Sequence, residues 1–483
     1  MSNLNKSLTF SLRWLSIESI AYHAIFLAHQ AFLFKYAGAH NYGIISVIFS
    51  IVYLATTIST FGLESSLSPF FKQIMACKKN FKKFFLIQLL PTVLLSILTV
   101  PILIIIKNGE LLSHKLFSPQ KLTFSQHINF LFIIIIFILI LSESAKKTLR
   151  GLLYLNFKNK FNMILEIGSL LAYVTTIWGV YAITSKITLN LVFIPMVIIS
   201  VISSIILLIF THKIYEKLPK NISLTQNIIN NICDNLNNTD NLQYKIFKTR
   251  AINFANQFTH NMFSSNFLVP FFALQFGLAQ AGIFKLLSHI SYTITMIMRK
   301  IFGWASDTML AHTKNLDIMS KQNMFHNINN RINNIMLALV IFLTINLTKI
   351  INYTNSNSSS SSTHTAINWP LIYFFLAITL IENLFISYEK FYIAEEKNGI
   401  ILSINAISIF MVSIIMFYSH FFAQLGQSGQ NMLLFAITAT RATCFLILVA
   451  ISHYKWRIGP KFIINPIYLI ISLIISLTVF KFI

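Results

Sequence analysis

Long apolar runs, separated by short polar or basic segments, recur along the whole chain. Each run is about 20 residues long, which is what an α-helix needs to cross the hydrocarbon core of a bilayer. Because a backbone in lipid must satisfy its own hydrogen bonds, we expect every run to be helical. The pattern predicts thirteen spans, near residues 13–34, 43–63, 84–106, 128–145, 161–184, 188–210, 250–272, 281–302, 332–350, 369–388, 399–421, 430–451 and 463–483.

Two glycine pairs recur at one spacing in the two halves of the chain. FKYAGAHNYGII contains Gly38 and Gly43, ALQFGLAQAGIF contains Gly277 and Gly282, and a shift of 239 in residue number relates the two pairs. The same shift places other residues in register: Glu143 with Glu382, and Lys158-Asn159 with Lys397-Asn398. These matches predict an internal duplication, and chance identity among abundant residue types is the alternative.

An all-helical membrane protein built from two six-helix bundles follows from this pattern. Six spans per half is an even number, so both halves enter from the same side and the repeat is parallel. The expected domains are an N-terminal bundle at 1–210, an Asn-rich cytoplasmic linker at 211–249, a C-terminal bundle at 250–451 and an additional helix within 452–483.

Composition and charge agree with a membrane protein. The 483 residues are 55% hydrophobic and only 11% charged, and 37 Lys and Arg outnumber 14 Asp and Glu. When the spans alternate, most of the basic residues fall on one side, which predicts a cytoplasmic N-terminus in the cell membrane. No nucleic-acid-binding motif accompanies the charge, and three cysteines without a C-x-x-C motif predict no metal site.

Catalytic motifs are absent from the sequence. There is no G-x-x-x-x-G-K-[ST] phosphate loop, no H-E-x-x-H and no nucleophile elbow. We therefore expect no enzyme and no cofactor. Ionisable residues inside the spans are the better candidates for function, since such residues persist mainly where they meet water or a partner.

Arg441 is the deepest of these residues, about ten residues from either end of its predicted span. A guanidinium at this depth cannot reach the membrane surface by extending its side chain. Two interpretations remain open. Arg441 binds a phosphate or sugar in a central cavity, or it pairs with a buried carboxylate such as Glu166 and holds two helices together.

Polar side chains also mark the first helix of each half. Glu18, His23 and His29 lie in the first span, and His260 lies in the seventh beside several Asn and Gln residues. We expect these stripes to face a shared aqueous cleft, and plain hydrogen bonding between helices is the alternative.

Three further cations are candidate binding residues. Arg13 and Arg250 begin the two helices that carry the polar stripes, and Lys285 follows Gly282 in the eighth span. Each is either an anion-attracting residue or an anchor at the membrane surface.

Two segments resemble a known transporter family. GAHNYGIISVIFSIVYLATTISTFGLESSLSPFF, from Gly38 to Phe71, and FGLAQAGIFKLLSHI in the second half are similar to polysaccharide and lipid-linked oligosaccharide flippases of the multidrug/oligosaccharidyl-lipid/polysaccharide (MOP) exporter superfamily. The resemblance implies a MATE-like pair of bundles around a cavity that opens alternately to each side. It also implies that cations such as Arg13 and Lys285 hold a pyrophosphate.

The function expected from the resemblance is the flipping of an undecaprenyl-pyrophosphate-linked sugar precursor across the cytoplasmic membrane. The partners to consider are this substrate, membrane lipids and glycosyltransferases or a polymerase of the same pathway, with the transporter itself as a monomer. One alternative is a cation-coupled multidrug exporter that uses Glu18 or Glu166, and a second is a membrane-embedded glycan-processing enzyme. The second predicted span contains no Lys or Arg in its apolar part, a departure from a strongly basic cavity.

Overall fold

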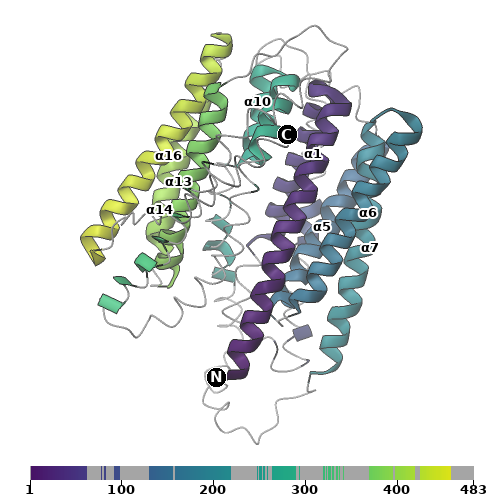
Figure 1. Ribbon diagram of the computed structural model, residues 1–483, viewed down its shortest axis with the longest axis horizontal. Coiled ribbons are helices and arrows are strands. Elements are labelled where there is room, and N and C mark those ends of the chain that lie inside the picture. The colour runs from purple at the N-terminus through teal and green to yellow at the C-terminus, as the bar shows by residue number, and fades with distance from the viewer. Residues whose placement is uncertain are drawn as a thin grey trace, which may run out of the picture. The chain divides into compact units, whose positions relative to one another are not determined.

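The described part of the chain is helical. The computed structural model describes residues 2–62, 130–155, 158–218, 264–289, 369–394, 398–418 and 425–457, with residues 92–97 and scattered positions at 75–82, 247–258, 293 and 319–341 (Figure 1). The predicted span at 463–483 lies outside the described residues, as do most of the span at 332–350 and most of the 211–249 linker. No strand occurs in these described ranges.

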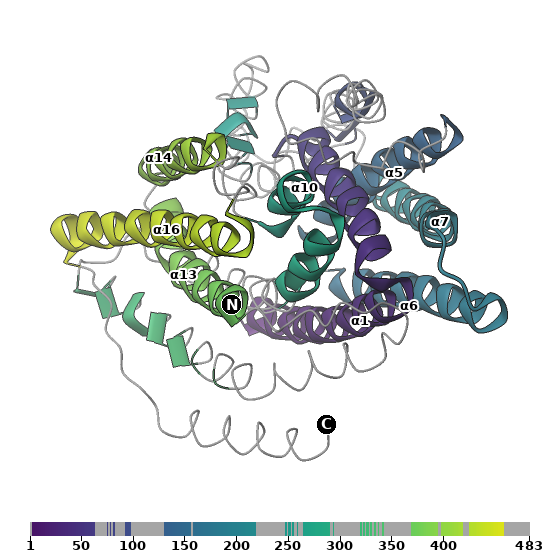
Figure 2. The ribbon, with the colours of Figure 1, turned by 90° about the horizontal axis from the view of Figure 1, so that it is seen from above.

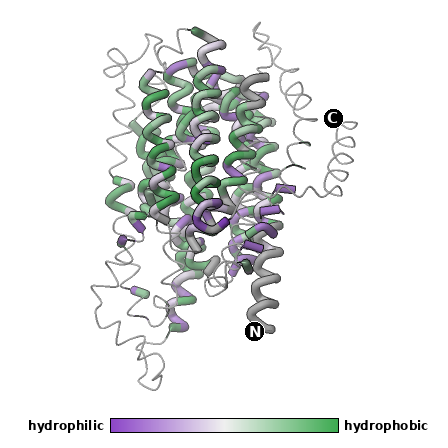
Figure 3. The backbone as a smooth tube through the Cα atoms, turned by 90° about the vertical axis from the view of Figure 1, so that its left-hand side faces the viewer, coloured by the Kyte–Doolittle hydropathy of each residue, from purple (hydrophilic) through white to green (hydrophobic). Residues whose placement is uncertain are grey.

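The helices have the following bounds: α1 Ser2–Thr60, α5 Phe130–Leu155, α6 Asn159–Thr184, α7 Leu189–Glu216, α10 Ser265–Phe276, α13 Trp369–Ala394, α14 Asn398–Phe417 and α16 Gly426–Trp456. Within the described residues, five helical segments are long and apolar enough to cross a membrane: Ile17–Thr60, Asn159–Thr184, Leu189–Glu216, Gly399–Phe417 and Ser428–Lys455. Apolar residues dominate these helices along their length (Figure 3). The chain is therefore a multi-pass membrane protein.

Helix α7 illustrates how a local pattern forms such a helix. The Thr188 hydroxyl accepts a hydrogen bond from the Leu191 N–H at 3.3 Å and caps the first turn. One face of α7 is buried and carries small polar groups, whereas isoleucines at helical spacing cover the opposite face. This outward apolar face is the one expected to contact lipid.

The helices keep the register of the internal duplication. The described parts of α5 and α13, Phe130–Leu155 and Trp369–Ala394, correspond under the shift of 239 found between the glycine pairs. The same shift relates the first residues of α6 and α14, Asn159 and Asn398. The predicted all-helical, parallel-repeat architecture is confirmed.

The first glycine of each pair interrupts a helix. Gly38 has φ 77° and ψ 160° inside α1, and Gly277 has φ 89° and ψ 164° directly after α10. This region of backbone space is accessible essentially to glycine alone. Both copies of the repeat therefore turn the chain sharply at the same place.

The second glycine of each pair allows two helices to touch. A Cβ atom added to Gly43 would lie 1.9 Å from the carbonyl oxygen of Leu278, and one added to Gly282 would lie 2.3 Å from that of Ala39. Ala39 and Leu278 correspond under the shift of 239, so the two contacts are the same contact made by each copy of the repeat. Only glycine permits backbones to approach this closely.

The chain forms two compact units. Unit 1 comprises Met1–Trp14 and Ile48–Met262, and unit 2 comprises Leu15–Val47 and Phe263–Ile483. The predicted bundles placed the whole first span with the N-terminal half, and this grouping differs in assigning Leu15–Val47 to unit 2.

Each unit contains one set of three packed helices (Figure 2). In unit 1, α7 packs on both α5 and α6, and in unit 2, α16 packs on both α13 and α14. The third helix is thus the shared neighbour in both sets.

Candidate functional site

A basic cluster lies inside unit 2, where Lys285 is only 2% exposed. Its ammonium donates hydrogen bonds to Asn266 Oδ1 and, at 3.5 Å, to Ser265 Oγ, both in the first turn of α10. His289, one turn after Lys285 in the helical segment 278–289, is also buried and interacts electrostatically with Lys285 and His23. Three nitrogen-bearing side chains are therefore grouped within one unit.

Aromatic contacts fix this cluster against α1. The ring of His289 meets Phe26 edge to face, with centroids 5.1 Å apart, and His23 lies against Tyr22 in a similar arrangement at 5.4 Å. His23 and Phe26 share one face of α1 because they are three residues apart. These ring contacts set the orientation of both imidazoles.

The chemistry of this cluster favours anions. An ammonium, two imidazoles and the N–H groups at the start of α10 supply hydrogen-bond donors in a region of low dielectric constant. Phosphate oxygens are acceptors for each of these donors. Of the predicted residues, the structure groups Lys285 with His23.

Other predicted residues of the polar stripes are placed differently. Glu18 is fully buried on α1, in the same unit as Lys285. The side chain of Arg13 and the whole of His260 lie outside the described residues. Their proposed roles stay predictions.

Arg250 belongs to unit 1 and is bound to backbone carbonyls. Its Nε donates to the carbonyl oxygen of Phe61 at 3.1 Å, and Nη2 donates to that of Thr60 at 3.0 Å. Its guanidinium also lies 5.5 Å from the centre of the Phe61 ring. A cation at these carbonyls compensates the negative end of α1, so Arg250 acts there as a C-cap.

Arg441 is fully buried in unit 2 and is paired. Its Nε donates to Glu382 Oε1 at 2.5 Å, and Nη1 donates to Asn405 Oδ1 at 2.9 Å. The guanidinium also lies 4.3 Å from the ring centre of Phe385. These contacts correspond to the helix-pairing interpretation of Arg441, but the carboxylate is Glu382 of α13, whereas the example that we expected was Glu166.

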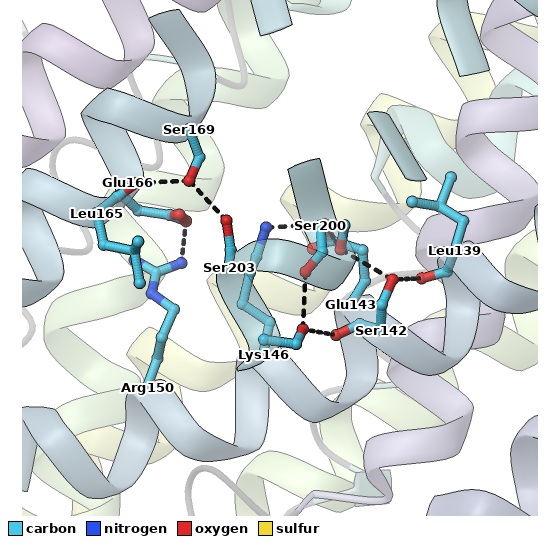
Figure 4. A network of polar contacts seen from close by, with 11 residues as sticks. Leu139, Ser142, Glu143, Lys146, Arg150, Leu165, Glu166, Ser169, Ser200 and Ser203 are labelled. Atoms are coloured by element: carbon cyan, nitrogen blue, oxygen red, sulfur yellow. Dashed lines mark hydrogen bonds and ion pairs between the residues drawn. The ribbon is translucent and has the colours of Figure 1, made fainter. Parts of the chain in front are cut away.

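Unit 1 carries its own polar layer, drawn in Figure 4. Lys146 Nζ lies 2.8 Å from Glu143 Oε1, and the Ser200 hydroxyl donates to the same oxygen at 2.7 Å. The Ser142 hydroxyl lies 2.9 Å from Ser200 Oγ, which continues the network from α5 to α7. A carboxylate, an ammonium and two hydroxyls are thus connected between α5 and α7.

A second ion pair completes this layer. Arg150 of α5 pairs with Glu166 of α6, and the hydroxyls of Ser169 and Ser203 meet at 2.7 Å between α6 and α7 (Figure 4). The side chains of Arg150 and Glu166 remain 19% and 12% exposed. Glu166 is therefore neutralised by a neighbour within its own unit.

Several of these residues were not identified from the sequence. Ser265, Asn266 and His289 have no distinguishing local pattern, although His289 falls one helical turn after Lys285. Glu143 and Glu382 were noted only because the shift of 239 relates them. A carboxylate at the same position of two predicted spans could have identified both as functional candidates. Among the described residues, no group of three or more His, Cys, Asp or Glu side chains is placed to hold a metal ion.

The sequence is similar to one family over more than half of its length. Residues 31–306 match the family described as polysaccharide biosynthesis protein. No curated protein matches the chain by sequence.

Solved structures with a similar fold are transporters. One is a multidrug resistance MATE family transporter of the MOP superfamily in its inward-facing conformation, with a TM-score of 0.60 and 11% identity over 92% of this chain and 94% of that one. Another is the lipid II flippase MurJ in an inward closed conformation, with a TM-score of 0.57 and 15% identity over 97% of both chains. A third is a MOP superfamily transporter from Pyrococcus furiosus Vc1 (DSM3638), with a TM-score of 0.56 and 11% identity over 92% and 95%. At these identities the similarity concerns the fold.

Proposed function

Because this chain belongs to the polysaccharide biosynthesis protein family and has the fold of the MOP superfamily transporters, we propose that it is a flippase for a lipid-linked sugar precursor. The cargo is an undecaprenyl-pyrophosphate-linked oligosaccharide or polysaccharide unit, moved across the cytoplasmic membrane by alternating access. The buried ammonium of Lys285, beside Ser265 and Asn266 at the start of α10, is the observation that supports an anionic headgroup most directly.

Lys285 is the central residue of this proposal. A buried ammonium gains more from a phosphate oxygen than from neutral acceptors, because the Coulomb term is large in a medium of low dielectric constant. The neighbouring imidazoles of His289 and His23 each offer a ring N–H donor, and the apolar lipid tail stays in the bilayer. Arg13 and His260 remain proposed contributors, and Arg250 and Arg441 are already bound to partners within their units.

In this proposal the protein does not hydrolyse ATP to drive transport. Since the sequence has no phosphate-binding loop for ATP, the ion gradient, the membrane potential or consumption of the product drives the cycle. The N-terminus is proposed to lie in the cytoplasm, as the distribution of Lys and Arg predicts.

A translocation assay in proteoliposomes tests the proposal. Purified protein is reconstituted with a fluorescent undecaprenyl-pyrophosphate sugar, and the fraction that reaches the outer leaflet is followed by quenching. We expect Lys285→Gln to lower the initial rate roughly tenfold or more, because a hydrogen bond to a charged group is worth about 1.5–3 kcal/mol. Lys285→Arg should retain more activity, and Lys213→Gln, at an exposed position of α7, is the matched control.

The same preparation distinguishes the drug-exporter alternative. That function requires an acidic site for an organic cation, and Glu166, one of its two candidate carboxylates, is paired with Arg150. Ethidium efflux by the wild-type protein, together with no movement of the lipid-linked sugar, would contradict the flippase proposal.

A further inference from the structure

The third helices of the two sets are related by a shift other than 239. Six buried positions of α7 coincide with six buried positions of α16 when the shift is 241. They are Val192, Phe193, Ser200, Ser203, Leu207 and Thr211 in unit 1, and Leu433, Leu434, Arg441, Cys444, Leu448 and Ser452 in unit 2. Under a shift of 239, Arg441 would instead correspond to Ile202, which is 51% exposed. The pattern of buried positions therefore aligns α7 with α16 at a shift of 241.

Ser200 and Arg441 consequently occupy the same position of the repeat. Ser200 donates to Glu143 at 2.7 Å, and Arg441 donates to Glu382 at 2.5 Å. Glu143 and Glu382 themselves correspond under the shift of 239 that relates α5 to α13. The same contact between first and third helices is thus made twice, once by a hydroxyl and once by a guanidinium.

The residue one turn after this carboxylate differs in the opposite way: it is charged in unit 1 and apolar in unit 2. Lys146, one turn after Glu143, is the ammonium that neutralises that carboxylate at 2.8 Å. Its counterpart one turn after Glu382 is Phe385, whose ring lies under the guanidinium of Arg441. The cation paired with this carboxylate of the repeat therefore lies on α5 in unit 1 and on α16 in unit 2.

We infer that the two three-helix sets carry two copies of one charge-compensated carboxylate site, in which the cation has moved between two positions of the repeat. In unit 2 the cation is Arg441, a positioning residue that neutralises Glu382 and ties α13, α14 and α16 together. It holds Glu382 on α13 and Asn405 on α14 at once. It does not bind cargo.

A cation can stand at either position of the repeat because a side chain at each one reaches Oε1 of the carboxylate: Lys146 and Ser200 reach Glu143, and Arg441 reaches Glu382. A carboxylate buried in a helix bundle requires a cation or a proton, and either location of the cation meets that requirement. The two locations of the cation differ in whether the cation connects one helix to another. Lys146 bonds within its own helix, so serines link the helices of unit 1, whereas Arg441 forms the interhelical link itself.

A relocation experiment tests this inference. Arg441→Ser should lower the melting temperature of the purified protein by several degrees, since Glu382 is left buried without its cation. Adding Phe385→Lys to Arg441→Ser rebuilds in unit 2 the arrangement of unit 1 and should restore most of that loss. Phe385→Lys alone places a second cation beside one carboxylate and should destabilise the protein.

A matched control separates charge relocation from a general effect of lysine. Phe391 lies on α13 and is also buried, at 1% exposure, but it does not correspond to Lys146. Phe391→Lys combined with Arg441→Ser should not recover stability. The reciprocal exchange, Lys146→Phe with Ser200→Arg, should be better tolerated than Lys146→Phe alone.

The outcomes are decisive even if Arg441→Ser does not fold. Recovery of a monodisperse protein by Phe385→Lys, or by the neutral pair Glu382→Gln with Arg441→Gln, supports the inference. No recovery by either would contradict it. Loss of cargo translocation by Arg441→Ser at an unchanged melting temperature would also contradict it, because that result assigns Arg441 to the cargo. Melting does not depend on any cargo, so the inference can fail or hold independently of the flippase function.

Discussion

The glycine turns and the charged layers are two duplicated regions that differ in how closely their two copies match. At the turns, both copies keep the same glycines, nearly the same backbone angles and the same reciprocal contact. In the charged layers, both copies keep the carboxylate but differ in the source and the position of its cation. The turns keep their glycines and their backbone contact in both copies, whereas the charged layers keep only a compensated carboxylate.

The difference reflects what each region requires. A backbone angle open only to glycine, or a carbonyl that an added Cβ would overlap, has a single solution among the amino acids. A buried carboxylate accepts any cation that reaches it, from either of two helices. Four predictions test this contrast, in decreasing order of the change in stability.

Glu382→Gln and Glu143→Gln remove the same carboxylate of the repeat from the two units. In unit 2 the change leaves Arg441, whose side chain is 1% exposed, buried without its carboxylate, which should lower the free energy of unfolding by about 3–5 kcal/mol. In unit 1, Lys146 and Glu143 are 15% and 23% exposed and not fully buried, so we expect a smaller loss of about 1 kcal/mol. Unfolding in mixed micelles of increasing dodecyl sulfate content measures both. Equal losses would show that the two layers do not differ as described.

Gly43→Ala and Gly282→Ala test the reciprocal contact. Each new Cβ would overlap a backbone carbonyl, so the two helices must separate, at about 1–3 kcal/mol per substitution. Gly179→Ala on α6, which has nothing within 4 Å of the added Cβ, is the control and should be neutral or slightly stabilising. A similar melting temperature for all three variants would exclude a close helix contact at these glycines.

Tyr42→Phe removes a polar link found in only one copy of the turn. The Tyr42 hydroxyl donates to Gln30 Oε1 at 2.8 Å, and both residues are buried. Under the shift of 239, their counterparts are Ala281 and Val269, which are also buried but apolar. We expect a loss of about 1 kcal/mol in the same unfolding assay. A further change of Gln30→Val should recover part of it, because the second copy shows that an apolar pair fits there.

Ser203→Cys copies unit 2 into unit 1, since Cys444 occupies the corresponding position. The hydroxyl of Ser203 meets that of Ser169 at 2.7 Å, and a thiol is a weaker partner. Hydrogen bonds between helices in membranes average about 0.6 kcal/mol, so the free energy of unfolding should fall by no more than about that amount. A larger loss would mean that the serine network of unit 1 is a principal source of its stability.

Much of the fold was predictable because its signals are local. Apolar runs of membrane-spanning length marked α6, α7, α14 and α16, and the two glycine pairs marked the turns. The family resemblance rested on the same turn segments, and the family match over residues 31–306 includes them.

The partners of the buried cations were not predictable from one sequence. Arg441 and Glu382 are 59 residues apart in the chain, and which carboxylate it meets depends on how α13 and α16 pack. The correspondence between α7 and α16 was obscured by two additional residues before α16, which change the shift from 239 to 241. Only the burial of each position reveals that change.

The reciprocal glycine contact has a consequence for the two copies of the repeat. Residue 43 meets residue 278 as residue 282 meets residue 39, which is the self-complementary geometry of an isologous interface within one chain. Each copy therefore supplies one glycine and one carbonyl to the same contact, and a side chain added at either glycine would push apart the segments that form both halves of it.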